Sequence, residues 1–159
     1  MIWMEIKGII PEDWVNYKDP CFVIEFPYCD WKCERECGRK VCHNSGLRKT
    51  SNYNVPLESL VEIYMANTIT KAICFQGLEP FDSPEWLELV DLFRQYTKDT
   101  IVIYTGYYEN EIAEQLKQLK KYSNIIVKFG RFVPNQPSRY DELLGVSLAS
   151  PNQYAKKIS

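Results

Sequence analysis

The sequence lacks the features that would indicate a membrane, a nucleic acid or a secreted setting. It contains no run of about 18 apolar residues, which a membrane-spanning helix requires. It does not begin with a charged segment followed by an apolar stretch and a small-residue cleavage site. The formal charge is -2 and the pI is near 5.5, so no basic excess is available for a nucleic acid or an anionic membrane. We therefore expect a soluble, cytoplasmic protein with no nucleic-acid or membrane partner.

Histidine is almost absent, and no internal repeat, low-complexity tract or domain linker is visible. His43 is the only histidine, and no base or carboxylate that would orient it is evident in the sequence. We interpret it as a packing or cofactor-contact residue and not as a general base. A chain of 159 residues with 45% hydrophobic residues is expected to form one domain, residues 1–159, around a single core.

Cysteine, in contrast, is concentrated in one stretch. Four of the six cysteines lie in a single loop: Cys29, Cys33, Cys37 and Cys42. The residues between them are heavily charged, and charged residues avoid a core unless they are paired, so packing does not explain these thiols. In a reducing cytosol such a group indicates a metal site or a catalytic site in preference to a disulfide framework. Cys21 and Cys74 lie in apolar strands and are interpreted as small core residues.

Apolar runs that alternate with helical patterns predict the fold. A leading edge strand is expected over residues 1–10, ended by Pro11. Buried strands are expected at 21–26, 71–75, 100–104 and 124–128, with helices between them and a last strand at 144–148. Strands that alternate with helices of roughly 10 to 15 residues indicate right-handed crossovers. The sequence therefore predicts an α/β fold with about five to six mostly parallel strands.

The unusual residues of the chain follow these strands. Parallel sheets of this kind bind ligands beyond the carboxyl ends of their strands. Four segments are placed there: the cysteine loop, Gly77-Leu78-Glu79-Pro80, Tyr104-Thr105-Gly106 and Gly130-Arg131. We expect the four loops to converge on one rim of the sheet.

These loops resemble those of the radical S-adenosylmethionine superfamily. Cys29-x3-Cys33, the later Cys42-His43-Asn44 and Gly77-Leu78-Glu79-Pro80 are similar to the superfamily's Cys-x3-Cys-x2-Cys loop and Gly-Gly-Glu-Pro segment. Three later segments are similar to the small activating proteins of anaerobic (class III) ribonucleotide reductase: Ile103 to Tyr107, Gly130 to Phe132 and Ser150 to Gln153. The resemblance extends over most of the chain, from about Met4 to Gln153.

The resemblance implies a partial, open (β/α) barrel of the radical S-adenosylmethionine type, with a [4Fe-4S] cluster and S-adenosylmethionine as cofactors. The implied activity is that of an oxidoreductase, in which one electron from the reduced cluster cleaves the cofactor to a 5′-deoxyadenosyl radical. In the activating proteins this radical removes a hydrogen from a glycine of the class III ribonucleotide reductase. A reducing electron donor such as a flavodoxin or a ferredoxin is also implied. Five or six strands cannot close an eight-stranded barrel, so we expect an open side that admits a protein loop.

The resemblance also assigns site residues. The implied cluster ligands are Cys29, Cys33 and Cys42, because His43 and Asn44 follow Cys42 as they follow the family's third cysteine. The spacer before Cys42 has eight residues in place of two and contains Cys37, so Cys29-x3-Cys33-x3-Cys37 stays an alternative ligand set. The expected cofactor-binding residues are Val41, His43, Asn44, Gln76, Gly77, Glu79, Pro80, Tyr104, Gly106 and Arg131.

Two positions in these loops carry conditions. Leu78 replaces the second glycine of the Gly-Gly-Glu-Pro segment, which is tolerable if that position needs no positive φ. Arg131 is equally compatible with a surface position.

Two other functions remain as alternatives. A radical S-adenosylmethionine enzyme that acts on a small molecule, such as a deazapurine synthase, would be expected to carry extra polar residues for its substrate. A zinc-stabilised binding module would use the four thiols in a closed tetrahedral site. Metal content alone distinguishes the zinc module from the two enzymes.

Overall fold

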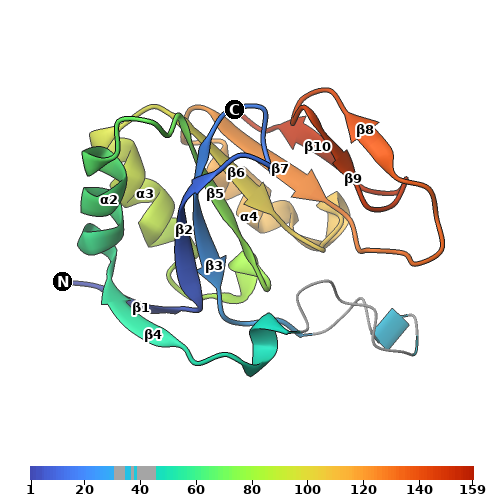
Figure 1. Cartoon of the computed structure of the whole chain (residues 1–159), viewed down its shortest axis with the longest axis horizontal. Helices are drawn as coiled ribbons and strands as arrows, with labels where there is room; N and C mark the ends of the chain where they lie inside the picture. The colour runs from blue at the N-terminus through green and yellow to red at the C-terminus, as the bar shows by residue number, and fades with distance from the viewer. Residues whose placement is uncertain (31–34, 37, 39–45) are drawn as a thin grey trace.

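The computed structural model describes residues 1–30, 35, 36, 38 and 46–159, and an open six-stranded sheet lies at its centre (Figure 1). The strand order is β10-β7-β6-β5-β3-β2. Four central strands are parallel: β3 (Cys21–Phe26), β5 (Ala72–Gly77), β6 (Thr100–Tyr104) and β7 (Ile125–Phe129). The two edge strands, β2 (Gly8–Asp13) and β10 (Tyr154–Lys157), are antiparallel to their neighbours. The predicted α/β fold with an open, mostly parallel sheet is confirmed.

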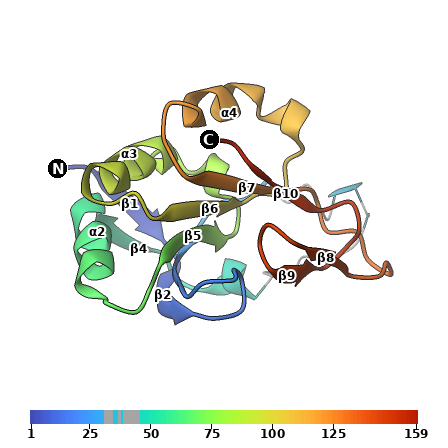
Figure 2. The same ribbon diagram turned by 90° about the horizontal axis from the view of Figure 1, so that it is seen from above.

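Among the described residues, three α-helices lie in the connections between the parallel strands and pack on one face of the sheet (Figure 2). They are α2 (Leu57–Ala66), α3 (Trp86–Tyr96) and α4 (Ala113–Leu119). Alternate residues of β3, namely Phe22, Ile24 and Phe26, point to this face and are fully buried against the helices. This layer is the larger hydrophobic core, because buried side chains of the helices join those of every parallel strand. None of the helices in the described ranges is both long and apolar enough to cross a membrane.

The opposite face of the sheet carries no helix among the described residues, and only part of it is covered (Figure 2). A smaller apolar cluster lies there, formed by the sheet together with Tyr17 and the hairpin of β8 (Arg139–Asp141) and β9 (Val146–Leu148). Cys21 and Cys74 belong to this cluster and are completely buried, which confirms that they are core residues. A hydrogen bond with Cys21 and burial raise the pKa of Cys74. The cluster does not reach the carboxyl ends of the parallel strands. The last residues of these strands on this face line the cavity described below.

A second, two-stranded sheet fixes the chain as it returns from the cysteine loop. β1 (Trp3–Ile6) pairs antiparallel with β4 (Tyr53–Pro56). The short 3-10 helix η1 (Leu47–Lys49) precedes β4, and the Lys7 ammonium donates hydrogen bonds to the main-chain oxygens of Arg48 and Thr50. The segment that follows the cysteines is thereby held against the start of the chain.

The structure corrects the expected strand at the start of the chain and adds a strand at its end. The leading strand does not end at Pro11: residues 3–13 form two strands, and Pro11 lies inside β2. β2 tolerates the proline because it is an edge strand whose register with β3 shifts between Ile10 and Asp13. The polar tail is also part of the sheet, because Tyr154–Lys157 pairs with β7 as β10. β4 and β8 are further short strands that the hydrophobic pattern does not predict.

Candidate functional site

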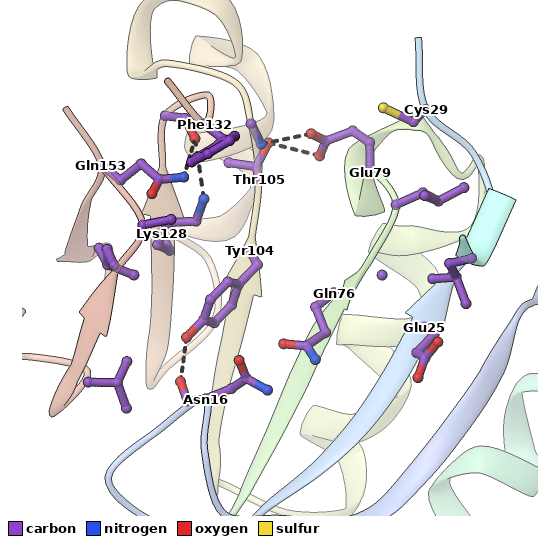
Figure 3. A pocket seen from close by; sticks show the side chains of 18 of the residues that line it. Asn16, Glu25, Cys29, Gln76, Glu79, Tyr104, Thr105, Lys128, Phe132 and Gln153 are labelled. Carbon is purple, nitrogen blue, oxygen red and sulfur yellow. Dashed lines mark hydrogen bonds between the residues drawn. The ribbon is translucent and has the colours of Figure 1, made fainter. Parts of the chain in front are cut away.

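A cavity of about 570 Å³ lies at the carboxyl ends of the parallel strands, on the face of the sheet opposite α2, α3 and α4 (Figure 3). Every predicted loop contributes to its wall: Cys29 after β3, Gly77 to Glu79 after β5, Thr105 and Gly106 after β6, and Gly130 and Phe132 after β7. Further parts of the wall come from β9, from Gly46 and Leu47, from Gln153, and from the loop around Val15 and Asn16. The predicted convergence of four loops on one rim is therefore confirmed for their described residues.

Gly77 allows the loop after β5 to lie against β3. Its φ is +90°, and a Cβ atom at this position would lie 2.7 Å from the main-chain nitrogen of Phe26. The next two amides continue the contact: Leu78 donates to the Phe26 carbonyl at 3.0 Å and Glu79 donates to the Tyr28 carbonyl at 2.6 Å. The loop that contains Cys29 is thus held beside the Gly77 segment by main-chain contacts.

Leu78 satisfies the condition set by the sequence analysis. In the described part of the chain, the non-glycine residues with positive φ are Asn124 and Asn135. The second position of the Gly-Gly-Glu-Pro segment therefore needs no glycine in this protein.

Glu79 connects the loop after β5 to the loop after β6. Its side chain is buried, with 2% exposed, and its carboxylate accepts hydrogen bonds from three described residues. Oε1 accepts from the amide of Gly106 at 2.9 Å, and Oε2 accepts from the Thr105 hydroxyl at 2.8 Å and from the Phe81 amide at 3.3 Å. Donors of this kind favour the charged form of a carboxylate and offset the cost of burying it. The Glu79 side chain therefore positions two walls of the cavity.

Arg131 extends this connection to two further loops. Its guanidinium forms a bidentate pair with Glu111, donates to the Gly106 carbonyl at 3.3 Å and lies 4.8 Å from the ring centre of Tyr108. Its Nε lies 2.9 Å from Oε1 of Glu36, which belongs to the spacer between the cysteines. Hydrogen bonding to Glu111 raises the pKa of Arg131. Since Arg131 is only 6% exposed, the interpretation as a surface arginine is wrong.

The segment from Ser150 to Gln153 closes the cavity beside Gly130. The Gln153 amide group donates to the Gly130 carbonyl at 3.3 Å, and its oxygen accepts from the Ser150 amide at 3.1 Å. The Ser150 hydroxyl accepts from the amide of Val133 at 3.2 Å. These contacts hold the loop after β7 against the end of the β9 segment.

A row of four polar side chains forms the floor of the cavity. The row consists of Glu25, Gln76, Tyr104 and Lys128, one from each parallel strand. The pairs Glu25–Gln76 and Tyr104–Lys128 are in register on neighbouring strands. The Tyr104 hydroxyl donates to the Asn16 carbonyl, and burial raises the pKa of Tyr104 (Figure 3). The Lys128 ammonium is buried, donates to the Gly130 carbonyl at 3.3 Å and lies 5.7 Å from the centre of the Tyr104 ring.

Glu25 and Lys128 are site residues that were not predicted from the sequence. The available signal was a single charged residue in an otherwise apolar strand: Glu25 in Cys-Phe-Val-Ile-Glu-Phe and Lys128 in Ile-Ile-Val-Lys-Phe. A strand that is buried on both faces has no structural need for a charge at such a position.

The expected site residues are distributed as follows. Six of them line the cavity: Cys29, Gln76, Gly77, Glu79, Tyr104 and Gly106. Pro80 and Arg131 are buried behind the wall. Cys33, Cys42, the alternative ligand Cys37, Val41, His43 and Asn44 lie outside the described residues, and the roles of all these residues in binding the cluster and the cofactor stay predictions. The described residues by themselves hold no group of three or more metal-ligating side chains, and Cys29 is the one thiol of the loop among them.

The contact at Gly77 predicts a specific effect on stability. Gly77→Ala places a methyl group against the main chain of β3 at an unfavourable φ, so the free energy of unfolding should fall by about 2 kcal/mol or more. Gly8→Ala is the matched control, because a Cβ at Gly8 meets no atom within 4 Å. Urea denaturation of both variants checks this. Equal midpoints for the two variants would show that the close contact at Gly77 is not a constraint.

A comparison with protein-family models identifies the domain. The model described as a 4Fe-4S single cluster domain matches residues 23–150, which is well over half of the chain. The match begins within β3 and includes the cysteine loop and the loops after β5, β6 and β7 that line the cavity. No curated protein matches the chain. The domain is of the radical S-adenosylmethionine type that is typical of activating enzymes, and the chain belongs to the 4Fe-4S single cluster domain family.

Proposed function

We propose that the protein is a glycyl-radical activating enzyme whose protein substrate is a class III ribonucleotide reductase. The observation that carries the proposal is the match to a 4Fe-4S single cluster domain, whose cysteine loop begins at the rim of an open cavity. When bound, the reduced cluster and S-adenosylmethionine supply a 5′-deoxyadenosyl radical by one-electron cleavage of a carbon–sulfur bond. A reducing donor such as a flavodoxin or a ferredoxin provides the electron.

The residues present fit this pair of cofactors. Thiolates are the usual ligands of iron–sulfur clusters, and the first of them, Cys29, is half-buried at the cavity wall. Three thiolate ligands leave one iron of a four-iron cluster for the amino and carboxylate groups of a methionine. Gly77, Leu78 and Glu79 line the same cavity, and main-chain oxygens of such a segment can accept hydrogen bonds from that amino group.

The protein's own side chains position the site and do not react. Glu79 holds the loops after β5 and β6 together, and Arg131 connects the loops after β6 and β7 to Glu36 of the cysteine loop. The walls of the cavity are thus connected to one another before a ligand enters. Such preorganisation reduces the cost of ordering a cofactor on binding.

The shape of the sheet supports a protein substrate. Its six strands end at the unclosed edges β2 and β10, so the sheet does not surround the cavity as a closed barrel would. A reactive radical must be kept from water, and an enzyme with an open side depends on its substrate for part of that exclusion. A folded partner that inserts a loop meets this need better than a small molecule does.

One observation favours a second candidate, an enzyme of the same type that acts on a small molecule. The floor of the cavity carries Glu25, Gln76 and Lys128, which are the kind of additional polar groups that such an enzyme would need. A zinc-stabilised binding module is disfavoured, because the matched family binds an iron–sulfur cluster.

The activase proposal predicts a radical on the partner. The anaerobically reconstituted, reduced protein should convert S-adenosylmethionine to 5′-deoxyadenosine and should produce a glycine-centred doublet on the class III ribonucleotide reductase of the same genome. Liquid chromatography measures the first product, and electron paramagnetic resonance detects the second. Cofactor cleavage without the doublet would favour the small-molecule enzyme, and zinc without iron or 5′-deoxyadenosine would favour the binding module.

The ligand set predicts a separate result. Replacing Cys29, Cys33 or Cys42 by alanine should abolish the cluster, whereas Cys37→Ala should retain a four-iron cluster, because Cys42 carries the His-Asn of the family pattern. Iron analysis and the absorption spectrum of each reconstituted variant check this. Loss of the cluster in Cys37→Ala but not in Cys42→Ala would assign the third ligand to Cys37 and leave the proposed activity unchanged.

A further inference from the structure

Glu25 is a carboxylate on the floor of the cavity, and the described part of the chain offers it no charged partner. Its neighbours in β3 are fully buried, and Glu25 itself is half-buried on the face that carries no helix. Across the described residues, no hydrogen bond or ion pair reaches its carboxylate. Burial alone raises the pKa of Glu25. A half-buried carboxylate without a partner lowers stability, so its presence requires another reason.

Gln76 provides a second polar group beside this carboxylate. The two residues are direct neighbours in the parallel pair of β3 and β5, which places their side chains on strands about 4.8 Å apart. The Gln76 side chain also makes no hydrogen bond within the described ranges, and it lines the same cavity. Figure 3 shows both side chains extending from the strands, away from the loops that carry Cys29 and Glu79.

The rest of this face shows that a structural role does not explain the pair. Val23 and Cys74 lie two residues before Glu25 and Gln76 on the same two strands, and so on the same face. Both are fully buried in the apolar cluster beneath the cavity. Apolar residues at positions 25 and 76 would simply continue that cluster. The change from apolar to polar occurs at the row where the cavity begins, so the two side chains face the space that a ligand would fill.

We propose that Glu25 and Gln76 form a substrate subsite that takes a guanidinium group, the end of an arginine side chain on the substrate segment. A carboxylate offers two coplanar acceptors that match a pair of guanidinium N–H groups, and the Gln76 carbonyl accepts a further N–H. An arginine also has the length to reach the cavity floor from a main chain at the rim. Lys128 lies at the other end of the row and repels a cation at that end of the cavity. The guanidinium group is therefore directed to Glu25, and the substrate binds in one orientation. That the arginine belongs to a protein substrate rests on the proposed function.

A binding measurement with two matched probes tests the subsite without requiring turnover. N-acetyl-L-argininamide and N-acetyl-L-citrullinamide have nearly the same shape, but only the first carries a positive charge. NMR titration of the anaerobic, cluster-loaded protein should give an affinity for the arginine probe at least about ten times that for the citrulline probe, in keeping with a charge-assisted pair. Glu25→Gln should abolish this preference, and Gln76→Leu should weaken it. Glu12→Gln is the matched control, because Glu12 is exposed on β2. This variant should keep the preference for the arginine probe.

Three results would overturn the subsite: equal affinities for the two probes, a preference that survives in Glu25→Gln, or equally tight binding of N-acetyl-L-lysinamide. Gln76→Leu keeps the test decisive if Glu25→Gln does not fold, because it leaves every charge in place. The outcome is separate from that of the activase experiment. If the arginine probe is preferred through Glu25 but no glycyl radical forms on the reductase, the subsite is supported and the reductase is excluded as the partner. If a glycyl radical forms but the arginine probe is not preferred, the activase proposal is supported and the subsite is excluded.

Discussion

The close contact between Gly77 and the main chain of β3 is the constraint on which the site depends. A side chain at position 77 would overlap the Phe26 nitrogen, so only glycine allows the loop after β5 to reach the segment that leads to Cys29. From that contact, Leu78 and Glu79 form main-chain hydrogen bonds with the loop after β3, and the Glu79 carboxylate is directed to the loop after β6. The first cysteine, the Gly77 segment and the Thr105-Gly106 loop therefore occupy fixed positions around one cavity.

Buried charges complete the rim, and each is satisfied in a different way. Glu79 is surrounded by donors, whereas Arg131 is paired with the carboxylates of Glu111 and Glu36. Removing Glu111 would leave the buried Arg131 guanidinium with fewer partners, and an uncompensated buried charge is strongly destabilising. Glu25 contrasts with both, because the described protein supplies it with no partner. The difference separates residues that build the rim from a residue that faces a ligand.

Much of this arrangement follows from the sequence, for physical reasons. Buried parallel strands are nearly continuous apolar runs, so β3, β5, β6 and β7 were predictable within a residue or two, and the loops after them had to meet at one rim. β10 was not predictable, because its mostly polar residues lack the apolar pattern of a buried strand. It forms at the edge of the sheet by pairing with β7. The pairing of Arg131 with Glu36 and Glu111 was equally inaccessible, since no sequence pattern relates three residues so far apart. The polar floor was detectable in principle, because Glu25 interrupts an apolar strand.

The central claim is that the cysteine loop and the Gly77 segment together hold a four-iron cluster with one iron available to a substrate group. Electron paramagnetic resonance of the reduced, reconstituted protein, recorded with and without S-adenosylmethionine, tests this most directly. The account predicts the signal of a reduced [4Fe-4S] cluster whose g values shift when S-adenosylmethionine is added, because its amino and carboxylate groups bind the open iron. A cluster signal that is unchanged by S-adenosylmethionine, or the absence of any iron–sulfur signal, would contradict it.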